Sequence, residues 1–446
     1  MSKSQEQGPV VPFAEPTWYT RVSPYYNASH ERLRDAVRAY VAEKVTPNCA
    51  EWEAQGFVPK EVLQEHSRQG YTAVTINPAA ISQYIGDVKL PGGLKPQEWD
   101  GFHDLICIDE IARCGYLGVI WALGCGDSIG CPPVVNFGSD SQKQRFIPSV
   151  ITGQSRFCLG VTEPDAGSDV ANITTTAERR GDHYIVNGAK KWITNGMWAD
   201  YCTTAVRTGG PGKKGISALV IPLAAKGVTR RKIYNSGVSA SGSTYLEFDD
   251  VDVPTSNLLG EENQGFKIIM SNFNHERLWL ACTSLRLARE CVTDAYKHAL
   301  TRITFGKPLI EHQAIRTKFS TIGTRILPAY AFMESLVAMS NSHARGPASS
   351  TSVGSKQEPR FGGLIAILKV VAGRTLEETV REMQQVMGGL GYSRTGKGAR
   401  IEQISRDVRV MVVGGGSEEI LSELAFVQEK RDLEEIENEK TVRSRL

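Results

Sequence analysis

The sequence predicts an α+β protein with an N-terminal α-helical domain over residues 17–155, a central antiparallel β domain over 156–263 and a C-terminal four-helix bundle over 264–430, followed by a charged tail over 431–446. Two observations predict this fold class. Apolar residues recur every three to four positions in both outer parts of the chain, as they do on one face of a helix. The middle part instead alternates with a period of two, between Gly and Pro residues that are typical of turns.

The N-terminal helical domain is predicted from an apolar stripe. Between residues 30 and 45, Leu33, Val37, Val41 and Val45 repeat at intervals of four, which places them on one helix face. Further helical segments are expected at 59–69 and 104–113, with Gly- and Pro-rich breaks at 90–93 and 131–135.

The central β domain is predicted from short alternating runs. Residues 183–187 alternate and follow Gly181-Asp182, a dipeptide typical of a tight hairpin turn. Other β-rich runs, separated by Gly or Pro, follow at 201–207, 216–221 and 244–248. This spacing predicts a small antiparallel sheet.

The helical period returns at Gly265. A stretch without internal Gly or Pro runs over 266–300, and two more long helices are expected at 316–339 and 364–387. Between these two, residues 341–363 are rich in Ser, Gly and Pro, which predicts a solvated loop. Together with a final helix, these segments predict a bundle.

Composition excludes several classes of function. The formal net charge is +2, so no nucleic-acid footprint is expected. No apolar run reaches bilayer-spanning length, so no membrane span is expected. The nine cysteines include no Cys-x-x-Cys pair, which predicts neither a metal site nor a disulfide framework. Residues 1–16 lack the apolar core of a secretory signal.

Two segments of the β domain carry polar groups that suit a cofactor. A bend from Thr162 to Gly167 exposes backbone N–H groups and the hydroxyls of Thr162 and Ser168, which match the carbonyl and phosphate oxygens of a flavin nucleotide. The alternative is an ordinary hydrogen-bonded turn. Trp192 either covers one face of an aromatic cofactor or lies in the core, and Thr194 is a candidate donor to a flavin ring nitrogen.

Three segments of the bundle are candidates for binding phosphate or adenine. Arg302, with Gly306 expected as the cap of its helix, either complements the helix dipole or contacts phosphate. The glycines that begin at Gly388 either cap a helix or, because they have no side chains, let a ligand approach the backbone closely. The loop 414–416 opens the last helix with Ser417 as its N-cap, which favours anions but lacks the Lys of a P-loop.

These five segments occur in the order found in acyl-CoA dehydrogenases, which the chain resembles over about residues 30–430. The segments are Thr162-Glu163-Pro164-Asp165-Ala166-Gly167-Ser168, Lys191-Trp192-Ile193-Thr194-Asn195-Gly196, Arg302-Ile303-Thr304-Phe305-Gly306 with His312-Gln313, Gln385-Val386-Met387-Gly388-Gly389, and Gly414-Gly415-Gly416-Ser417-Glu418-Glu419. The resemblance implies an FAD cofactor at a subunit interface and a homotetramer, or dimer of dimers.

The resemblance also implies which residues bind FAD. Some of the later positions reach the cofactor partly from a neighbouring subunit. The expected FAD-binding residues are Leu159, Val161, Thr162, Gly167, Ser168, Trp192, Ile193, Thr194, Arg302, Thr304, His312, Gln313, Gln385, Gly388, Gly389, Gly416, Ser417 and Glu419.

The catalytic base is expected at an unusual place. Many relatives carry a Glu just before the Gly-Thr/Ser of the last loop, where this chain has Gly415. A minority, similar to the isovaleryl-type branch, carries the base on the first long bundle helix, one residue before an Arg, as in Glu276-Arg277. Glu276 is therefore the expected base. Asn274, Arg277 and Ser168 match substrate-contacting positions.

Gly415 keeps a role without a side chain. In the family, the enolate oxygen of the substrate receives a ribityl hydroxyl and the backbone N–H at this position, and Gly415 still has that N–H. The alternative for Glu276 is a surface residue in a helix salt bridge. Because residues 278–280 are apolar, we expect instead a water-poor pocket that raises the pKa of its carboxyl group.

The implied activity is the FAD-dependent α,β-dehydrogenation of an acyl-CoA thioester, in which Glu276 removes the Cα proton and a hydride passes from Cβ to flavin N5. Electrons are then expected to reach an electron-transferring flavoprotein. Two alternatives keep the fold. An oxygen-using flavin oxidase or monooxygenase is disfavoured because Gly415 supplies no acidic residue in the late loop. A non-catalytic flavin-binding scaffold that docks nucleic acid is disfavoured by the near-neutral charge.

The last three residues, Ser444-Arg445-Leu446, are a conservative variant of the Ser-Lys-Leu peroxisomal address. A chance tripeptide on a charged tail is the alternative. We therefore expect a peroxisomal protein, and otherwise a cytoplasmic one. In a peroxisome, oxygen becomes a candidate electron acceptor.

Overall fold

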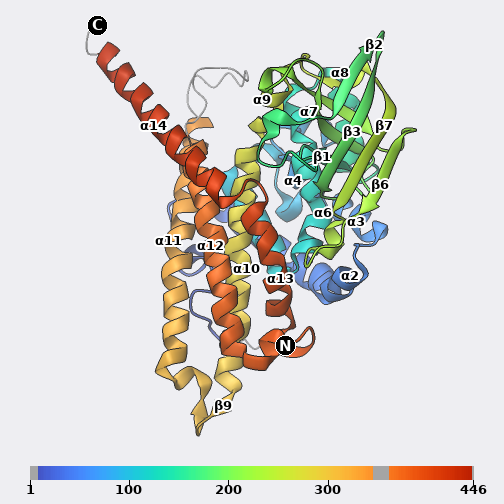
Figure 1. Cartoon of the computed structure of the whole chain (residues 1–446). Coiled ribbons are helices and arrows are strands. Elements are labelled where there is room, and N and C mark those ends of the chain that lie inside the picture. The colour runs from blue at the N-terminus through green and yellow to red at the C-terminus, as the bar shows by residue number, and fades with distance from the viewer. Residues whose placement is uncertain (1–8, 345–360, 444–446) are drawn as a thin grey trace.

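The computed structural model describes residues 9–344 and 361–443. It places the N-terminal helices and the β domain beside one half of a bundle of long helices, while the β9 hairpin lies at the opposite end of that bundle (Figure 1). The predicted order of helical domain, β domain and bundle is confirmed.

The predicted apolar stripe forms the core of the N-terminal domain. Leu33, Val37, Val41 and Val45 are at most 1% exposed. Helix α1 ends at Tyr40 and the stripe continues through one π-helical turn. The helices of this domain are α1 (Ala28–Tyr40), α2 (Cys49–Gln55), α3 (Lys60–Arg68), α4 (Tyr71–Ile76), α5 (Gly101–Ile111), α6 (Leu117–Gly130), α7 (Pro132–Phe137) and α8 (Asp140–Ile151).

The β domain is one sheet in the order β6-β7-β3-β2-β4-β5-β8, with β1 paired to β4. Its strands are β1 (Phe157–Gly160), β2 (Thr176–Arg180), β3 (His183–Ile193), β4 (Tyr201–Arg207), β5 (Ile216–Pro222), β6 (Val228–Lys232), β7 (Thr244–Pro254) and β8 (Leu258–Leu259). Gly181-Asp182 forms the expected turn between β2 and β3. The sheet is antiparallel except where β1, and a single bridge of β2, run parallel to β4. Strand β1 follows helix α8, so no tight turn forces it to be antiparallel.

The bundle is built from α9 (Gly265–Ser271), α10 (Phe273–Thr301), α11 (Gln313–Ala344), α12 (Gly362–Met387), α13 (Ala399–Val413) and α14 (Glu418–Arg443). The stretch 266–300, expected to be continuous, is interrupted at Asn272, whose side chain donates to the Ser128 carbonyl. Polar side chains of this kind compete with the helical backbone. The interruption matters because it places Glu276 in the first turn of α10.

The expectation that Gly306 caps the long helix was wrong. Helix α10 ends at Thr301, with Arg302 as its C-cap. Phe305 and Gly306, with φ of 49° and 78°, instead form the turn of a hairpin between β9 (Ile303–Thr304) and β10 (Lys307–Pro308). Two consecutive positive φ angles characterise the type I′ turn that two-residue hairpins prefer.

Part of the expected loop over 341–363 and part of the charged tail over 431–446 are helical. Residues 341–344 continue α11 and residues 362–363 begin α12, so only 345–360 of the expected loop lie outside the described residues. Residues 431–443 of the expected tail continue α14, which extends beyond the body of the protein (Figure 1). The tripeptide 444–446 lies outside the described residues.

Within residues 9–344 and 361–443, one stretch, Leu117–Phe137, is long and apolar enough to cross a membrane, but 78% of its most apolar window is buried within the fold, as in a core helix. All nine cysteines are free thiols, and eight of them are buried.

Candidate active site

One cavity of about 850 Å³ opens between the β domain, helices α5 and α6, and the start of α10. Many of the expected site residues line it. They are Leu159, Val161, Thr162, Gly167, Ser168, Trp192, Ile193, Thr194, Glu276, Arg277, Gly415 and Gly416. The cavity therefore joins residues that are more than 250 positions apart in the sequence.

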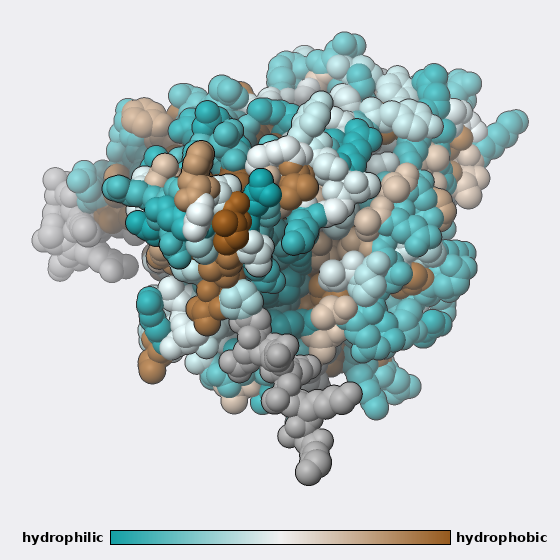
Figure 2. Space-filling model, turned by 90° about the horizontal axis from the view of Figure 1, so that it is seen from below, coloured by the Kyte–Doolittle hydropathy of each residue, from teal (hydrophilic) through white to brown (hydrophobic). Residues whose placement is uncertain are grey.

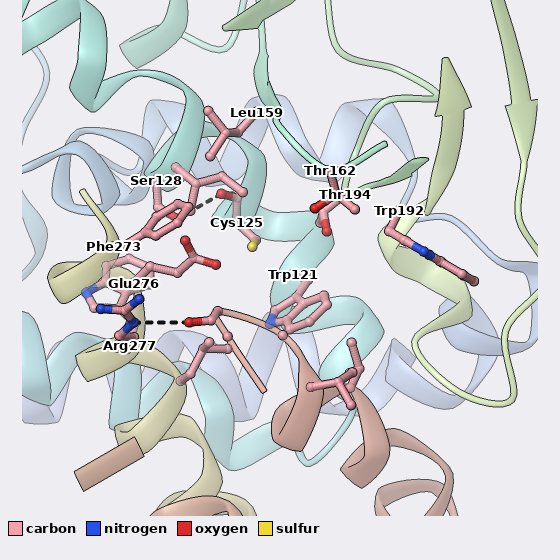
Figure 3. Close-up of a pocket in the computed structure, with 18 of the residues that line it drawn as sticks. Trp121, Cys125, Ser128, Leu159, Thr162, Trp192, Thr194, Phe273, Glu276 and Arg277 are labelled. Carbon is pink, nitrogen blue, oxygen red and sulfur yellow. Dashed lines mark hydrogen bonds between the residues drawn. The ribbon is translucent and has the colours of Figure 1, made fainter. Parts of the chain in front are cut away.

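The Glu276 carboxylate points into this cavity from the first turn of α10, toward Cys125 and Trp121 of α6 (Figure 3). Burial raises its pKa above the ordinary value, against the opposing charges of Arg277, Lys369 and His275. Among the described residues, it forms no ion pair, so the alternative of a surface salt bridge is not what this structure contains. A carboxylate with a raised pKa in a cavity is suited to accept a proton.

Gly415 adjoins this carboxylate. A Cβ placed on Gly415 would lie 3.8 Å from Glu276 Oε1 and 2.6 Å from Leu280 Cδ1. A side chain at 415 and the side chain of Glu276 therefore reach the same part of the cavity. The φ of Gly415 is +68°, a conformation that favours glycine. Among the described residues, its backbone N–H has no partner, which leaves this donor free for a ligand.

Arg277 connects α10 to this glycine loop. Its Nε donates to the Gly415 carbonyl at 3.1 Å and its Nη1 to Asn274 Oδ1 at 3.3 Å; the first of these bonds is drawn in Figure 3. Asn274 is exposed and does not line the cavity. The contact that this structure shows for its side chain is the hydrogen bond from Arg277, and its role toward the substrate stays a prediction.

Lys369 of α12 is a residue that the sequence reasoning missed. Its side chain is 2% exposed, and its Nζ donates to the carbonyls of Val412 at 2.6 Å and Gly416 at 2.9 Å. Burial, together with the charge of Arg277, lowers its pKa to about 8. Lys369 thus fixes both ends of the glycine loop. A lone Lys within the apolar run 364–372 was the available signal.

The opposite wall of the cavity carries the expected β-domain residues. Thr162 and Thr194 both line this part of the cavity (Figure 3), and neither hydroxyl has a hydrogen-bond partner among the described residues. Ser168 is exposed on the bend that follows Thr162. Free hydroxyls that converge on a cavity are suited to a ligand rich in carbonyl and ring nitrogen acceptors.

Trp192 is turned out of the sheet by an irregularity. The register of β3 against β7 shifts between Lys190 and Ile193, and Trp192 has φ of +66°. Its side chain is 53% exposed, so the core interpretation was wrong. Bulges of this kind re-aim side chains next to active sites, and a non-Gly residue with positive φ costs of order 1 kcal/mol.

A buried ion pair supports this wall. Lys190 Nζ contacts Glu163 Oε1 at 2.7 Å, and both side chains are at most 4% exposed. The Glu163 carboxylate also accepts from the backbone N–H groups of Thr174 and Thr175. Glu163 lies within the predicted flavin-binding segment 162–168, but its role as the partner of Lys190 was not predicted from the sequence.

Seven expected cofactor residues lie away from this cavity. They are Arg302, Thr304, His312, Gln313, Gln385, Gly388 and Gly389. Arg302 follows 26 residues after Glu276 along α10, a separation of about 39 Å at the rise of an α-helix. The Thr304 hydroxyl and His312 Nε2 are 3.1 Å apart in the hairpin region. These residues form a second cluster at the other end of the bundle (Figure 1).

Ser417 and Glu419 flank the start of α14, next to the cavity but not in its lining. The Ser417 carbonyl accepts from Leu421 N–H, as at a helix N-cap position. The neighbouring Gly416 does line the cavity, so the predicted anion-favouring helix start adjoins it.

Comparison with known proteins gives a consistent result. Models of the N-terminal, middle and C-terminal domains of acyl-CoA dehydrogenase match residues 27–154, 158–251 and 263–426. The chain is 55% identical to an acyl-CoA dehydrogenase of Alternaria alternata, over 96% of this chain and 97% of that protein. It is 40% identical to one of Emericella nidulans, over 94% and 95%.

Solved structures agree. The acyl-CoA dehydrogenase of Geobacillus kaustophilus has a TM-score of 0.79 and 28% identity, covering 91% of this chain and 99% of that one. The butyryl-CoA dehydrogenase of Megasphaera elsdenii has a TM-score of 0.78 and 27% identity, covering 91% and 100%.

Proposed function

The chain belongs to the acyl-CoA dehydrogenase family, a family of flavin-dependent oxidoreductases that dehydrogenate acyl-CoA thioesters, and we propose that Glu276 is the base of this reaction. One observation carries the proposal. The Glu276 carboxylate enters the cavity at the point that a side chain of Gly415 would reach, 3.8 Å from the position of its Cβ. The carboxylate that the last loop lacks is thus supplied from α10.

The cavity suits FAD as the specific flavin. The unpartnered hydroxyls of Thr162 and Thr194, the open space at Gly167 and the exposed indole of Trp192 lie along one wall. Hydroxyl donors match the ring carbonyls and nitrogens, and an indole can cover the ring face. Bound there, FAD supplies the acceptor for the hydride that leaves Cβ of the substrate.

The residues of this chain then perform the proton chemistry. Glu276 accepts the Cα proton, and its raised pKa brings a carboxylate closer to the acidity range in which a base is effective. The thioester oxygen gains negative charge as this proton leaves. The free N–H of Gly415 stabilises that charge, because a preorganised backbone donor requires no rearrangement during the reaction. Arg277 and Lys369 keep the loop in place through its carbonyl oxygens.

We also propose that the protein is a homotetramer, or dimer of dimers, in which a second subunit completes each cofactor site. The distant cluster that contains Arg302 and His312 supports this proposal, since it cannot reach the cavity of its own chain. Exposed apolar side chains lie at the same end of the bundle, visible as brown atoms in Figure 2. They include Ile303, Phe305 and Leu390, which are between 40% and 97% exposed.

The electron acceptor and the compartment form a linked proposal. An electron-transferring flavoprotein is the acceptor expected from the resemblance, and the terminal Ser444-Arg445-Leu446 supports a peroxisomal address, where oxygen is the competing acceptor. Imaging a fluorescent fusion with a free C-terminus tests the address. Removal of the three residues should disperse a punctate signal, and an unchanged distribution would exclude it.

The activity is tested by anaerobic titration of the purified flavoprotein with a panel of saturated CoA esters. We expect at least one ester to bleach the flavin and to yield the 2,3-enoyl-CoA. Rapid oxygen consumption with a substrate that lacks CoA, and no bleaching by any ester, would instead favour a flavin oxidase.

A further inference from the structure

The cavity has a second wall that the dehydrogenation itself does not explain. It comes from helices α3 to α6, of which α4 packs on α5 and α6 and α3 packs on α4. Most of its lining is apolar, with Ile108, Ile111, Ile120 and Leu123. This composition suits the acyl chain of a thioester whose reacting end lies at Glu276.

This wall nevertheless contains a buried imidazole. His66 of α3 lines the cavity, and its side chain is 1% exposed. Its Nδ1 lies 2.9 Å from the Tyr40 hydroxyl. Its Nε2 has no hydrogen-bond partner among the described residues. A polar side-chain atom on a cavity wall that has no protein partner takes one from the ligand or from water.

The surroundings of His66 define the chemistry of that partner. Burial, and to a lesser extent the charge of Arg156, lowers the pKa of His66 to about 3, so the ring is neutral at physiological pH. Arg156 is itself paired with Asp127 at 2.9 Å. Among the described residues, Arg156 is the charged group that acts on His66, so an anion meets no unpaired cation at this ring, whereas a neutral hydrogen-bonding group meets a suitable nitrogen.

The cavity reaches this wall because α6 carries a glycine there. A Cβ on Gly124 would lie 3.0 Å from Thr75 Oγ1, which is too close for most side chains. Thr75 donates its own hydroxyl to the Tyr71 carbonyl at 2.9 Å, so its oxygen remains an acceptor that faces the cavity. His66 and Thr75 are thus two polar residues in the lining that α3 and α4 contribute to the cavity.

We propose that the acyl group oxidised by this protein carries a neutral oxygen function, a hydroxyl or a carbonyl, near the end remote from the thioester, and that this oxygen bonds to His66 Nε2. The inference rests on the proposed function, since only then is the occupant an acyl chain. A plain alkyl tail would leave Nε2 buried and unpaired. A site with a hydrogen-bonding group of its own discriminates against ligands that cannot satisfy it.

The test compares CoA esters of matched chain length that end in a methyl, a hydroxyl or a carboxylate group, from short to long chains. Anaerobic flavin bleaching gives kcat/KM for the holoenzyme, and calorimetry on Glu276→Gln holoenzyme gives Kd without turnover. At the length that reaches His66, we expect the hydroxyl ester to have a kcat/KM about tenfold higher, and a Kd about tenfold lower, than the methyl ester. The carboxylate ester should be the poorest of the three.

Three variants locate the effect. His66→Leu should abolish the preference for the hydroxyl ester, because it removes the nitrogen. His66→Gln should retain it, because a Gln amide reaches a similar point. Tyr40→Phe should also retain it, because Tyr40 contacts the other ring nitrogen. If His66→Leu does not fold, the double variant Tyr40→Phe/His66→Leu also removes the hydroxyl that the single change leaves unpaired.

Two results would overturn the inference. Equal or better use of methyl esters at every length would mean that water alone satisfies Nε2. A hydroxyl preference that survives His66→Leu would place its origin elsewhere. These results differ from failure of the proposed function, in which no CoA ester of any kind bleaches the flavin.

Discussion

At the scale of single residues, the proposed reaction depends on the positions of Glu276 and Gly415. Glu276 and Gly415 belong to separate helix ends, and a side chain on either reaches the same part of the cavity. The position from which the base comes is therefore exchangeable in principle, whereas the backbone N–H at 415 is retained whichever residue supplies the base.

This exchange predicts a partial rescue. In the Glu276→Gln background, Gly415→Glu restores a carboxylate to the cavity, but its Cβ would collide with Leu280 Cδ1 at 2.6 Å. We expect the triple variant Glu276→Gln/Gly415→Glu/Leu280→Ala to recover more flavin bleaching than the variant that keeps Leu280. The recovery should remain incomplete, because a left-handed conformation costs a non-Gly residue roughly 1 kcal/mol. If both variants contain full FAD but bleach the flavin no faster than Glu276→Gln alone, then side chains at 276 and 415 do not reach the same part of the cavity.

Lys369 predicts a shift in pH dependence. The base is active when ionised, so activity rises with pH through the pKa of Glu276, which the charge of Lys369 lowers. Removing this charge in Lys369→Met should raise that pKa and move the acidic limb of the kcat/KM profile to higher pH by roughly one unit. Lys318→Met, which removes a bundle Lys paired with Glu382, is the matched control and should not move the limb. A purely structural role for Lys369 would lower the rate at every pH without this shift.

At the scale of elements, the wall of β-domain residues depends on the ion pair beneath it. Glu163→Gln leaves Lys190 buried without a counter-charge, which should destabilise the fold by about 3 kcal/mol and weaken FAD retention. The double variant Glu163→Gln/Lys190→Met should recover most of the stability, because neither partner is then left charged. Thermal unfolding and flavin content measure both effects. A single variant as stable as wild type would show that the pair does not support the wall.

The same pair predicts acid sensitivity. Burial opposes ionisation of Glu163, but Lys190, together with the hydrogen bonds from Thr174 and Thr175, outweighs it and lowers the pKa of Glu163 from 4.5 to about 2. Because the folded pKa lies below the unfolded one, the contribution to stability is complete above about pH 4.5 and is lost as pH falls toward 2. The melting temperature of wild type should therefore fall more steeply over this range than that of the double variant. Parallel curves would contradict this assignment.

How far the sequence predicts these elements depends on the range of the interactions involved. The stripe from Leu33 to Val45 is a local period, and it correctly predicted a buried helical face. The exposure of Trp192 arises from a register shift between β3 and β7, and the turn at Gly306 arises from pairing of β9 with β10. Such pairings depend on strands that a local pattern does not specify.

In the candidate site too, residues within local motifs were predicted, whereas residues that act through distant partners were not. The base and its glycine loop came from motif resemblance, and the cavity confirms that Glu276 and Gly415 meet. Lys369, His66 and the role of Glu163 were missed because each acts through a partner distant in sequence. A single Lys or His in a helix has no signature of its own until the fold shows what surrounds it.

At the scale of the whole molecule, the cavity and the distant Arg302 cluster predict a shared site between subunits. Light scattering should give a mass near 196 kDa, four times the 48.9 kDa of the chain. Glu276→Gln and Arg302→Glu should each be inactive alone. When the two are co-expressed, hybrid interfaces contain some sites with both Glu276 and a partner's Arg302, so about a quarter of the wild-type activity should return. No return of activity in mixed oligomers would mean that Arg302 does not serve a neighbouring site.

The most direct measurement of the central claim is the anaerobic reaction of Glu276→Gln with a CoA ester that bleaches the wild-type flavin, with the exposed-site variant Glu311→Gln as control. Because the substituted amide has nearly the shape of the carboxylate but cannot accept the proton, we expect FAD content and ester Kd close to wild type. Bleaching should slow by roughly 10³-fold, the contribution typical of a general base. Bleaching at the wild-type rate would show that the Cα proton goes to another group and that Glu276 is not the base.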